Sequence, residues 1–223
     1  MTCCCNVLTG RALISSITRE PPRPPTVETI LKSVSWAGGN TTAELTFSML
    51  WNSWSDLDFR LKIADGTISV GNKRLSTGIL DVDMNVGSQP REENTSKNSN
   101  PGVENIYFPI YTSAPSGDYD VGYYQYGTWH DRKHQGDIPK VLVMRRTFGG
   151  SPRRMQSESY VLIEFPSRIN PDRNGQYFNV ARFNKSEGGF TLTHLAEKAV
   201  ITSSGGEGIT IPSDIGSIPL LRT

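Results

Sequence analysis

Residues 56–63 read Asp56-Leu57-Asp58-Phe59-Arg60-Leu61-Lys62-Ile63 and carry the pattern of a half-buried β-strand. Apolar residues take every second position, which is the period of an extended chain whose successive side chains point to opposite faces. The preceding segment, 45–51, alternates in the same way. Asp56 and Asp58 are therefore expected on one face of a strand. Because strands disfavour aspartate, two of them at this spacing suggest a local purpose.

Short β-patterned segments separated by turn residues continue along the chain. Strands are expected over 34–36, 43–51, 56–64, 67–70, 80–85, 105–111, 119–126, 140–147, 160–165 and 177–183. Asp65-Gly66 is a hairpin signal between two of them. No long helix is expected between 40 and 148, and the one short helix expected lies over 193–200. The pattern predicts an all-β fold, an antiparallel β-sandwich, over residues 27–148.

The two ends of the chain depart from this pattern and predict contacts with other protein subunits. Residues 1–26 are expected to form an N-terminal arm, with a proline-rich stretch at 20–25 that favours extended backbone. Residues 149–223 are expected to form a β-rich extension that ends in an apolar tail. Because such arms and tails gain order by lying on partners, 1–26 and 205–223 are the predicted contact segments. For the tail, return to its own domain as an edge strand is an equal alternative.

The cysteines and the charge balance bear on partners. All three cysteines lie together at Cys3, Cys4 and Cys5. They are expected to be free thiols, to be acylated, or to make inter-chain contacts through a disulfide or a shared metal. The formal net charge is +1, from 23 basic and 22 acidic residues, which does not favour a nucleic-acid partner. The sequence predicts no membrane span and no standard secretory signal.

Five short motifs in 45–126 resemble a bacterial β-sandwich family typified by the YfaP-like proteins. The motifs are Leu50-Trp51, Asp56-Leu57-Asp58, Gly78-Ile79-Leu80-Asp81-Val82-Asp83, Glu104-Asn105-Ile106-Tyr107 and Pro115-Ser116-Gly117-Asp118-Tyr119-Asp120-Val121. The chain departs from the family pattern at the extra Trp54 and at Phe59-Arg60, where the family tends to carry Leu-His. The resemblance implies a β-sandwich more than it implies an activity. It also implies an accessory or interaction module, of a kind that includes phage particle proteins.

The acidic residues of these motifs are the candidate metal ligands: Asp56, Asp58, Asp81, Asp83 and Glu104. Each Asp-x-Asp pair places two carboxylates on one side of a strand or strand end. Ca²⁺ takes about six to eight oxygen ligands, so these acids are expected to bind it with help from Asn85 or Asn105. The alternative is that they cap turns and pair with nearby lysines and arginines. A glycosidase-type carboxylate pair is the enzymatic alternative.

The leading interpretation is a non-enzymatic structural or assembly protein of a large particle. A phage virion component of the baseplate, fibre-attachment or capsid-decoration type fits the arm, the tail and the lack of a catalytic motif. Such a protein is expected to be oligomeric and to be located in the virion. The alternative is a glycan-binding β-sandwich module of the bacterial cell surface, with Tyr123, Tyr124, Tyr126 and Trp129 as a sugar-stacking platform.

Overall fold

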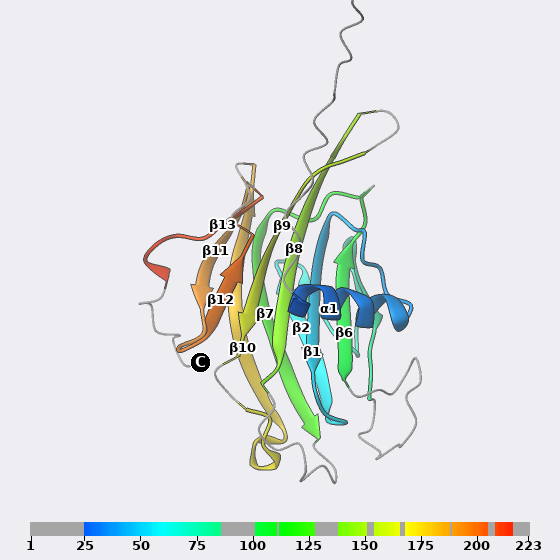
Figure 1. Ribbon diagram of the computed structural model, residues 1–223, viewed down its shortest axis with the longest axis vertical. Coiled ribbons are helices and arrows are strands. Elements are labelled where there is room, and N and C mark those ends of the chain that lie inside the picture. The colour runs from blue at the N-terminus through cyan, green and yellow to red at the C-terminus, as the bar shows by residue number, and fades with distance from the viewer. Residues whose placement is uncertain are drawn as a thin grey trace, which may run out of the picture.

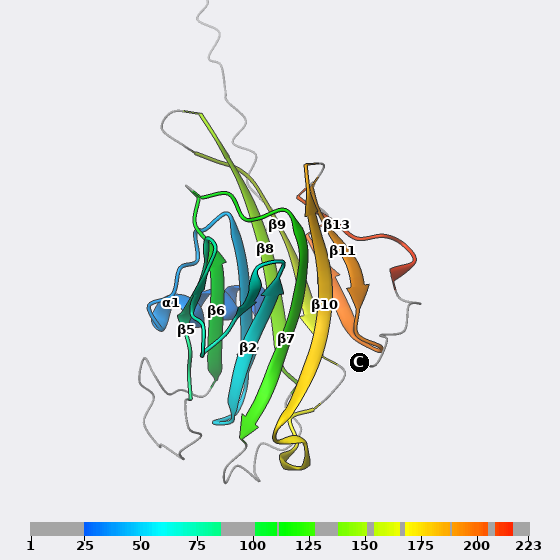
Figure 2. The same ribbon diagram turned by 180° about the vertical axis from the view of Figure 1, so that it is seen from behind.

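Two β-sheets stacked face to face make up the molecule, and one α-helix lies across the outside of one of them (Figures 1 and 2). The computed structural model describes residues 25–85, 101–110, 112–127, 138–150, 154–165, 168–187, 189–204 and 208–215. The prediction of an all-β sandwich is confirmed. No long helix is found among the described residues between 40 and 148, as expected.

The seven-stranded sheet combines strands from the first half of the chain with strands from its last part. Its strands, in spatial order, are β12 (Val200–Ser203), β9 (Arg154–Glu164), β8 (Lys140–Gly149), β1 (Leu45–Trp51), β6 (Gly102–Phe108), β5 (Gly78–Val82) and β4 (Arg74–Leu75). All its pairings are antiparallel. The central strand, β1, is therefore paired along both of its edges.

The six-stranded sheet faces it. Its strands, in spatial order, are β13 (Ile209–Thr210), β11 (Gly189–Leu195), β10 (Gln176–Ser186), β7 (Gly117–Gly127), β2 (Asp56–Ile63) and β3 (Gly66–Ile68). The chain enters it directly from β1, and β2 then turns at Asp65-Gly66 to pair with β3, as predicted. This pairing reaches back only to Leu61, so the first half of β2 has no neighbour strand on that edge.

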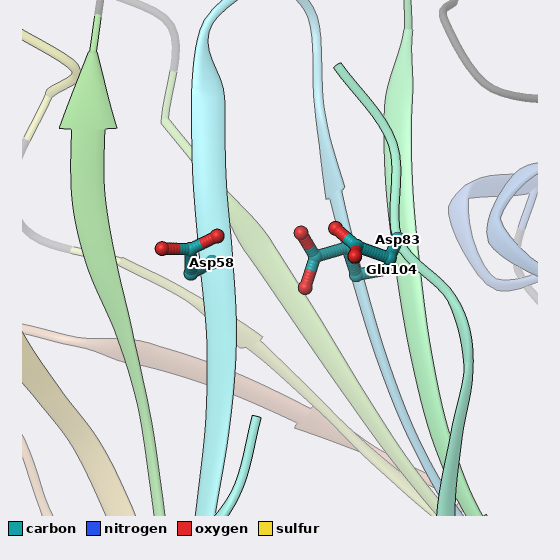
Figure 3. A group of neighbouring side chains, drawn as sticks. All are labelled: Asp58, Asp83 and Glu104. Atoms are coloured by element: carbon teal, nitrogen blue, oxygen red, sulfur yellow. The ribbon is translucent and has the colours of Figure 1, made fainter. Parts of the chain in front are cut away.

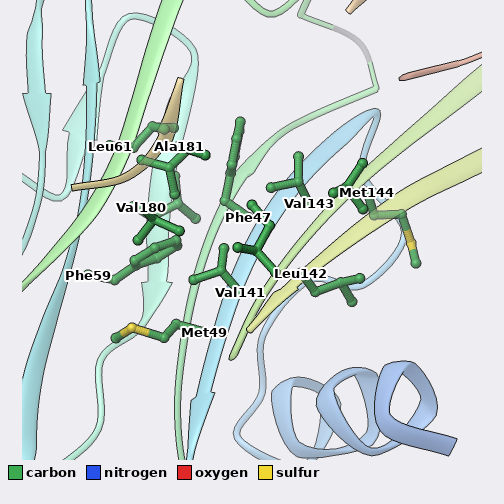
Figure 4. Close-up of a cluster of buried hydrophobic side chains, with 14 of the residues drawn as sticks. Phe47, Met49, Phe59, Leu61, Val141, Leu142, Val143, Met144, Val180 and Ala181 are labelled. Atoms are coloured by element: carbon green, nitrogen blue, oxygen red, sulfur yellow. The ribbon is translucent and has the colours of Figure 1, made fainter. Parts of the chain in front are cut away.

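Apolar side chains from both sheets fill the space between them (Figure 4). Leu57, Phe59, Leu61 and Ile63 of β2 are all buried, as the alternation in the sequence predicts. Trp51 is also a core residue, and its indole Nε1 donates a hydrogen bond to the carbonyl oxygen of Ser55 (2.9 Å). That bond holds the short crossing from β1 to β2, and so helps to set where β2 begins.

The predicted strand at 34–36 is wrong, because these residues end the helix α1 (Pro25–Trp36). Val27, Ile30 and Val34 are fully buried and stand at helical spacing. The helix ends at Gly38, whose φ is +84° and whose amide bonds the carbonyl of Ser35, while the amide of Gly39 bonds that of Val34. This is a Schellman motif, which needs a residue in the left-handed region and so favours glycine.

The predicted helix at 193–200 is also wrong. Residues up to Leu195 belong to β11, and those from Val200 belong to β12, which lies in the other sheet. Lys198, with a φ of +64°, sits in the turn that joins them. Pairing of β11 with β10 and of β12 with β9 outweighs the weak local preference for helix.

The boundary predicted after residue 148 does not separate two structural units. It falls inside β8, and β9 to β13 complete both sheets. Of the apolar tail, Ile209 lies in the edge strand β13, which pairs in parallel with β11, and Ile215 is buried as well. This part of the tail therefore returns to its own domain. Residues 1–24, with the three cysteines, and 216–223 lie outside the described residues.

Among the helices of the described ranges, none is both long and apolar enough to cross a membrane.

Candidate metal site

Three of the five predicted acids come together around the strand β2 where it lies across from β6. They are Asp58 on β2, Asp83 just after β5 and Glu104 on β6, and one carboxylate oxygen from each lies within 4.8 Å of the others. In Figure 3 the carboxylates of Asp83 and Glu104 point toward β2, and Asp58 turns one oxygen toward them around that strand. The group therefore links the seven-stranded sheet to the six-stranded sheet.

Glu104 makes the direct connection between the sheets. It stands opposite Met49 in the β1–β6 pairing, on the face that looks into the sandwich. Its Oε2 accepts a hydrogen bond from the backbone amide of Phe59 (2.7 Å). That amide belongs to the half of β2 that β3 does not cover. Glu104 thus occupies the position that a longer β3 would take.

Two oxygens of the group are buried and accept no hydrogen bond from any described residue. They are Oε1 of Glu104 and Oδ1 of Asp83. Glu104 is only 1 % exposed, so water does not solvate it freely. A buried carboxylate oxygen without a partner is costly, and native structures usually supply a donor, a water or an ion. These two oxygens therefore mark the place where a further ligand would be stabilising.

Negative charge is in excess at this site. The ammonium group of Lys73 pairs with Oδ2 of Asp83 (2.8 Å), and Arg60 partly offsets the charge of Asp58. Burial, and then Asp83, raise the pKa of Glu104 well above its usual range, although the Phe59 amide opposes the rise. Burial and then Asp83 also raise the pKa of Asp58. Both carboxyls would bind a proton, or a metal ion in its place, more readily than an isolated acid.

The other two predicted ligands lie outside the triad. Asp56 is buried nearby on β2 and adds to the negative potential at Glu104. Asp81 instead accepts hydrogen bonds from the amide of Asn40 (2.6 Å) and from Nδ2 of Asn105 (2.8 Å). These bonds fasten the segment that follows α1 onto β5 and β6.

The two asparagines expected to complete the shell are engaged elsewhere. The amide oxygen of Asn105 accepts a hydrogen bond from Ser48 (2.7 Å), inside a buried network that also includes Asp81. Asn85 directs its Nδ2 toward the carbonyl oxygens of Ser53 and Ser55 (3.4 Å each) and so helps to hold the crossing from β1 to β2. The sequence patterns predicted neither network, although a buried Asn within a strand is a signal that a partner is needed.

The donor set fits a hard divalent cation. All three groups offer carboxylate oxygens, which suit Ca²⁺, and no thiol or imidazole is part of the group. Ca²⁺–O distances of about 2.3–2.6 Å place two ligand oxygens no more than about 5 Å apart. The 4.8 Å limit observed here meets that condition. Three carboxylates leave room for carbonyl oxygens or water to complete the coordination.

The arrangement does not suit a glycosidase. Asp58 is 8 % exposed and Glu104 1 %, so both carboxylates are largely buried. A cavity of about 440 Å³ lies elsewhere, between α1 and the strands β8 and β9. None of the five predicted acids lines it.

Comparison of the chain with protein-family models, with curated proteins and with solved structures finds no match in any of the three. The resemblance to the YfaP-like proteins therefore stays a prediction.

Proposed function

We propose that this protein is a non-enzymatic structural β-sandwich of a large particle, specifically a phage virion component, and that Ca²⁺ bound by Asp58, Asp83 and Glu104 joins its two sheets. The observation that carries the proposal is the unpartnered Oε1 of Glu104, on a carboxylate that bridges the sheets while only 1 % exposed. An acid in this position cannot meet a substrate. It can hold an ion that ties β6 to β2.

A structural ion suits a particle protein for a physical reason. An ion that binds only the folded state adds stability by mass action without enlarging the hydrophobic core. The near-zero net charge and the apolar, proline-interrupted end of the chain also support a role among protein neighbours rather than on a polyanion. The proposed contacts with those neighbours are made by 1–26 and by the end of the tail, and both require testing by experiment.

The ion is tested by thermal unfolding of the full chain in EDTA and in excess CaCl₂. At a concentration of about 100 times Kd, a folded-state-specific ion adds about 2.7 kcal/mol. For a chain of this size, that gain corresponds to a rise in Tm of about 5–10 °C. Equal melting temperatures in the two buffers, with no calcium found by elemental analysis of purified protein, would refute the site.

A matched pair of variants locates the ion. Asp83→Asn removes a proposed ligand, so its Tm should no longer respond to CaCl₂. Asp81→Asn changes an acid two residues away that faces Asn40 and Asn105, so it should lower Tm in both buffers and keep the full calcium response. A calcium response that survives in Asp83→Asn and is lost in Asp81→Asn would place the ion elsewhere.

The particle is tested separately. In the free protein, limited proteolysis should cleave within residues 1–24, and the same bonds should be protected in the assembled particle. Resistance of this segment in a monomer would contradict the assembly proposal and leave the calcium proposal intact. Genes for tail or head proteins on either side of the coding sequence are the expected genomic setting.

A further inference from the structure

The outer face of the six-stranded sheet carries a group of tyrosines that the core does not use. Tyr124 and Tyr126 lie on β7 and point away from the sandwich, and Tyr177 on β10 is the direct cross-strand partner of Tyr124. Tyr126 is 59 % exposed and Tyr177 43 %. Large aromatic side chains exposed side by side are uncommon on a monomeric surface and mark binding sites. We call Tyr124, Tyr126 and Tyr177 the tyrosine face.

Only part of the predicted sugar platform is present at this face. Tyr123 points into the core, where its ring stacks on Phe178 with centroids 4.9 Å apart. Trp129 lies outside the described residues. Tyr177 takes the place of Tyr123. The register of β10 against β7, with its irregularity between Asn179 and Ala181, places Tyr177 on this face beside Tyr124.

The ring of Tyr177 lies down along the sheet. Its hydroxyl reaches diagonally to Gly122 on the neighbouring strand, so closely that any side chain at 122 would collide with it. The hydroxyl therefore lies over β7, the strand between β10 and β2. A ring held in this position presents one flat face to solvent. Glycine at 122 is what allows the ring to lie flat.

Polar groups surround the rings. The guanidinium carbon of Arg60 lies 4.8 Å from the ring centroid of Tyr124, and Arg60 Nε is buried there. Asn179, exposed beside Gly122, offers both a donor and an acceptor. A flat aromatic surface edged by such donors and acceptors suits a ring-shaped ligand with an apolar face and hydroxyl edges.

The charges of this face favour a neutral ligand. Lys62 and Arg182 are matched by Asp118 and Asp120 on the neighbouring strands. Arg60 lies near Asp58, whose carboxylate also belongs to the proposed metal site. Arg182 and Asp120 form an ion pair. A balanced set of this kind gives no net attraction to a polyanion and none to a polycation.

We infer that the tyrosine face binds a neutral saccharide chain, with sugar rings stacked on Tyr126 and Tyr177 and hydroxyls bonded by Arg60 and Asn179. The site lies outside the sandwich and requires neither the metal nor a partner chain. Its ligand is the pyranose ring, whose apolar face packs on an aromatic ring while its edges exchange hydrogen bonds.

The test is isothermal titration of the full chain with three neutral probes: cello-oligosaccharides, chito-oligosaccharides and malto-oligosaccharides. Binding of at least one probe is expected. Tyr177→Ala and Tyr126→Ala should each weaken it by about ten-fold, equivalent to about 1.4 kcal/mol. Tyr107→Ala is the matched control, since Tyr107 is a part-exposed tyrosine on β6 of the other sheet, and it should bind as the unmodified protein does.

Two results would overturn the inference. One is the absence of heat and of saturation-transfer NMR signal with all three probes at millimolar concentration. The other is binding that Tyr107→Ala weakens as much as Tyr177→Ala does, with all variants melting as folded proteins. The titration is run in EDTA and again in CaCl₂. A lack of saccharide binding in both buffers would overturn this inference and leave the calcium proposal unaffected.

Discussion

The two sheets are joined in two different ways at two places in the sandwich. At one place aromatic rings meet: Phe47 of β1 stacks on Tyr119 of β7 (centroids 5.9 Å apart) and meets the edge of Phe190 of β11 (6.2 Å). At the other, Glu104 of β6 bonds the backbone of β2 beside two more carboxylates. The rings bury apolar surface, which favours folding under all conditions in which water is the solvent. The acids favour folding only when a proton or a cation offsets their charge.

The difference predicts which contact depends on solution conditions. Removing a ring should cost the same free energy of unfolding in calcium and in EDTA, because apolar burial does not involve the ion. Changing an acid should alter the free energy of unfolding by different amounts in the two buffers, because the ion binds at the acids and not at the rings.

The largest expected effect is on the aromatic side. Phe47→Ala removes a fully buried ring and should lower the free energy of unfolding by about 3–5 kcal/mol. The loss should be the same in CaCl₂ and in EDTA, measured by equilibrium denaturation. If this variant does not fold, Phe47→Leu, at about 1 kcal/mol, serves instead. A loss that differs clearly between the buffers would show that the two contacts are coupled.

A second buried glutamate, Glu158, should respond to a change to glutamine with a loss of stability, in contrast to Glu104. Glu158 pairs with Arg146 at 2.7 Å, and both side chains are buried on the outer side of the seven-stranded sheet. Glu158→Gln removes the carboxylate charge from this buried pair and should cost about 3 kcal/mol in either buffer. A negligible cost, measured by urea unfolding, would mean that Arg146 finds other acceptors of equal strength.

The same substitution at the acidic site should act in the opposite direction. Glu104→Gln removes one of three crowded charges and keeps an oxygen for the amide of Phe59. In EDTA it should stabilise the protein by about 1–2 kcal/mol, because the remaining acids lose a repelling neighbour. It should also abolish the calcium response. Destabilisation in EDTA would contradict the view that repulsion between the charge of Glu104 and those of its neighbours lowers the stability of the metal-free protein.

The raised pKa values give a pH dependence with a definite sign. Glu104 and Asp58 bind protons more tightly in the folded than in the unfolded state, so the folded protein holds more protons above their ordinary pKa values of 4.5 and 3.8. Stability in EDTA should therefore fall as pH rises from these values through the raised folded-state pKa values, and level off above them. CaCl₂ should reduce this fall, since the ion replaces the protons. Thermal melting measures the stability at each pH. A rise in stability over the same range would contradict raised folded-state pKa values for these two acids.

The smallest effect is expected at Lys73, which is half-exposed and pairs with Asp83. Lys73→Met should change the metal-free stability by less than about 1 kcal/mol, as exposed ion pairs do. It should also raise the affinity for Ca²⁺ by a few-fold, because the ammonium group no longer competes for Oδ2 of Asp83. Titration calorimetry with CaCl₂ measures the change, and a weakened affinity would mean that Lys73 orients Asp83 rather than competing at it.

Local patterns predicted the sheets well and the helix poorly. The alternation in 56–63 identified β2 and its buried face, and Asp65-Gly66 identified its turn. Val27, Ile30 and Val34 carry an equally clear helical spacing followed by a Gly-Gly stop, yet the β pattern of the rest of the chain favoured a strand at 34–36. The signal for α1 is present in the sequence, since matching 25–36 against both periods selects the helical one.

The error at 193–200 is of a different kind. The segment has no strong period of its own, and both its ends are strand because β10 and β9 are available to pair with them. Such pairings join residues far apart in the chain, so no local pattern reports them. The same holds for residues after 148, which read as an extension and are in fact the strands that complete both sheets.

Local sequence was enough to predict an all-β sandwich and the buried side of β2. It was enough because side-chain alternation and turn preference follow from local sterics. Which acids meet is a property of the folded molecule: Asp58, Asp83 and Glu104 converge, whereas Asp81 turns to Asn40. That choice depends on where β3 stops along β2 and how β6 lies across from it, and both are set by packing between sheets rather than by neighbouring residues.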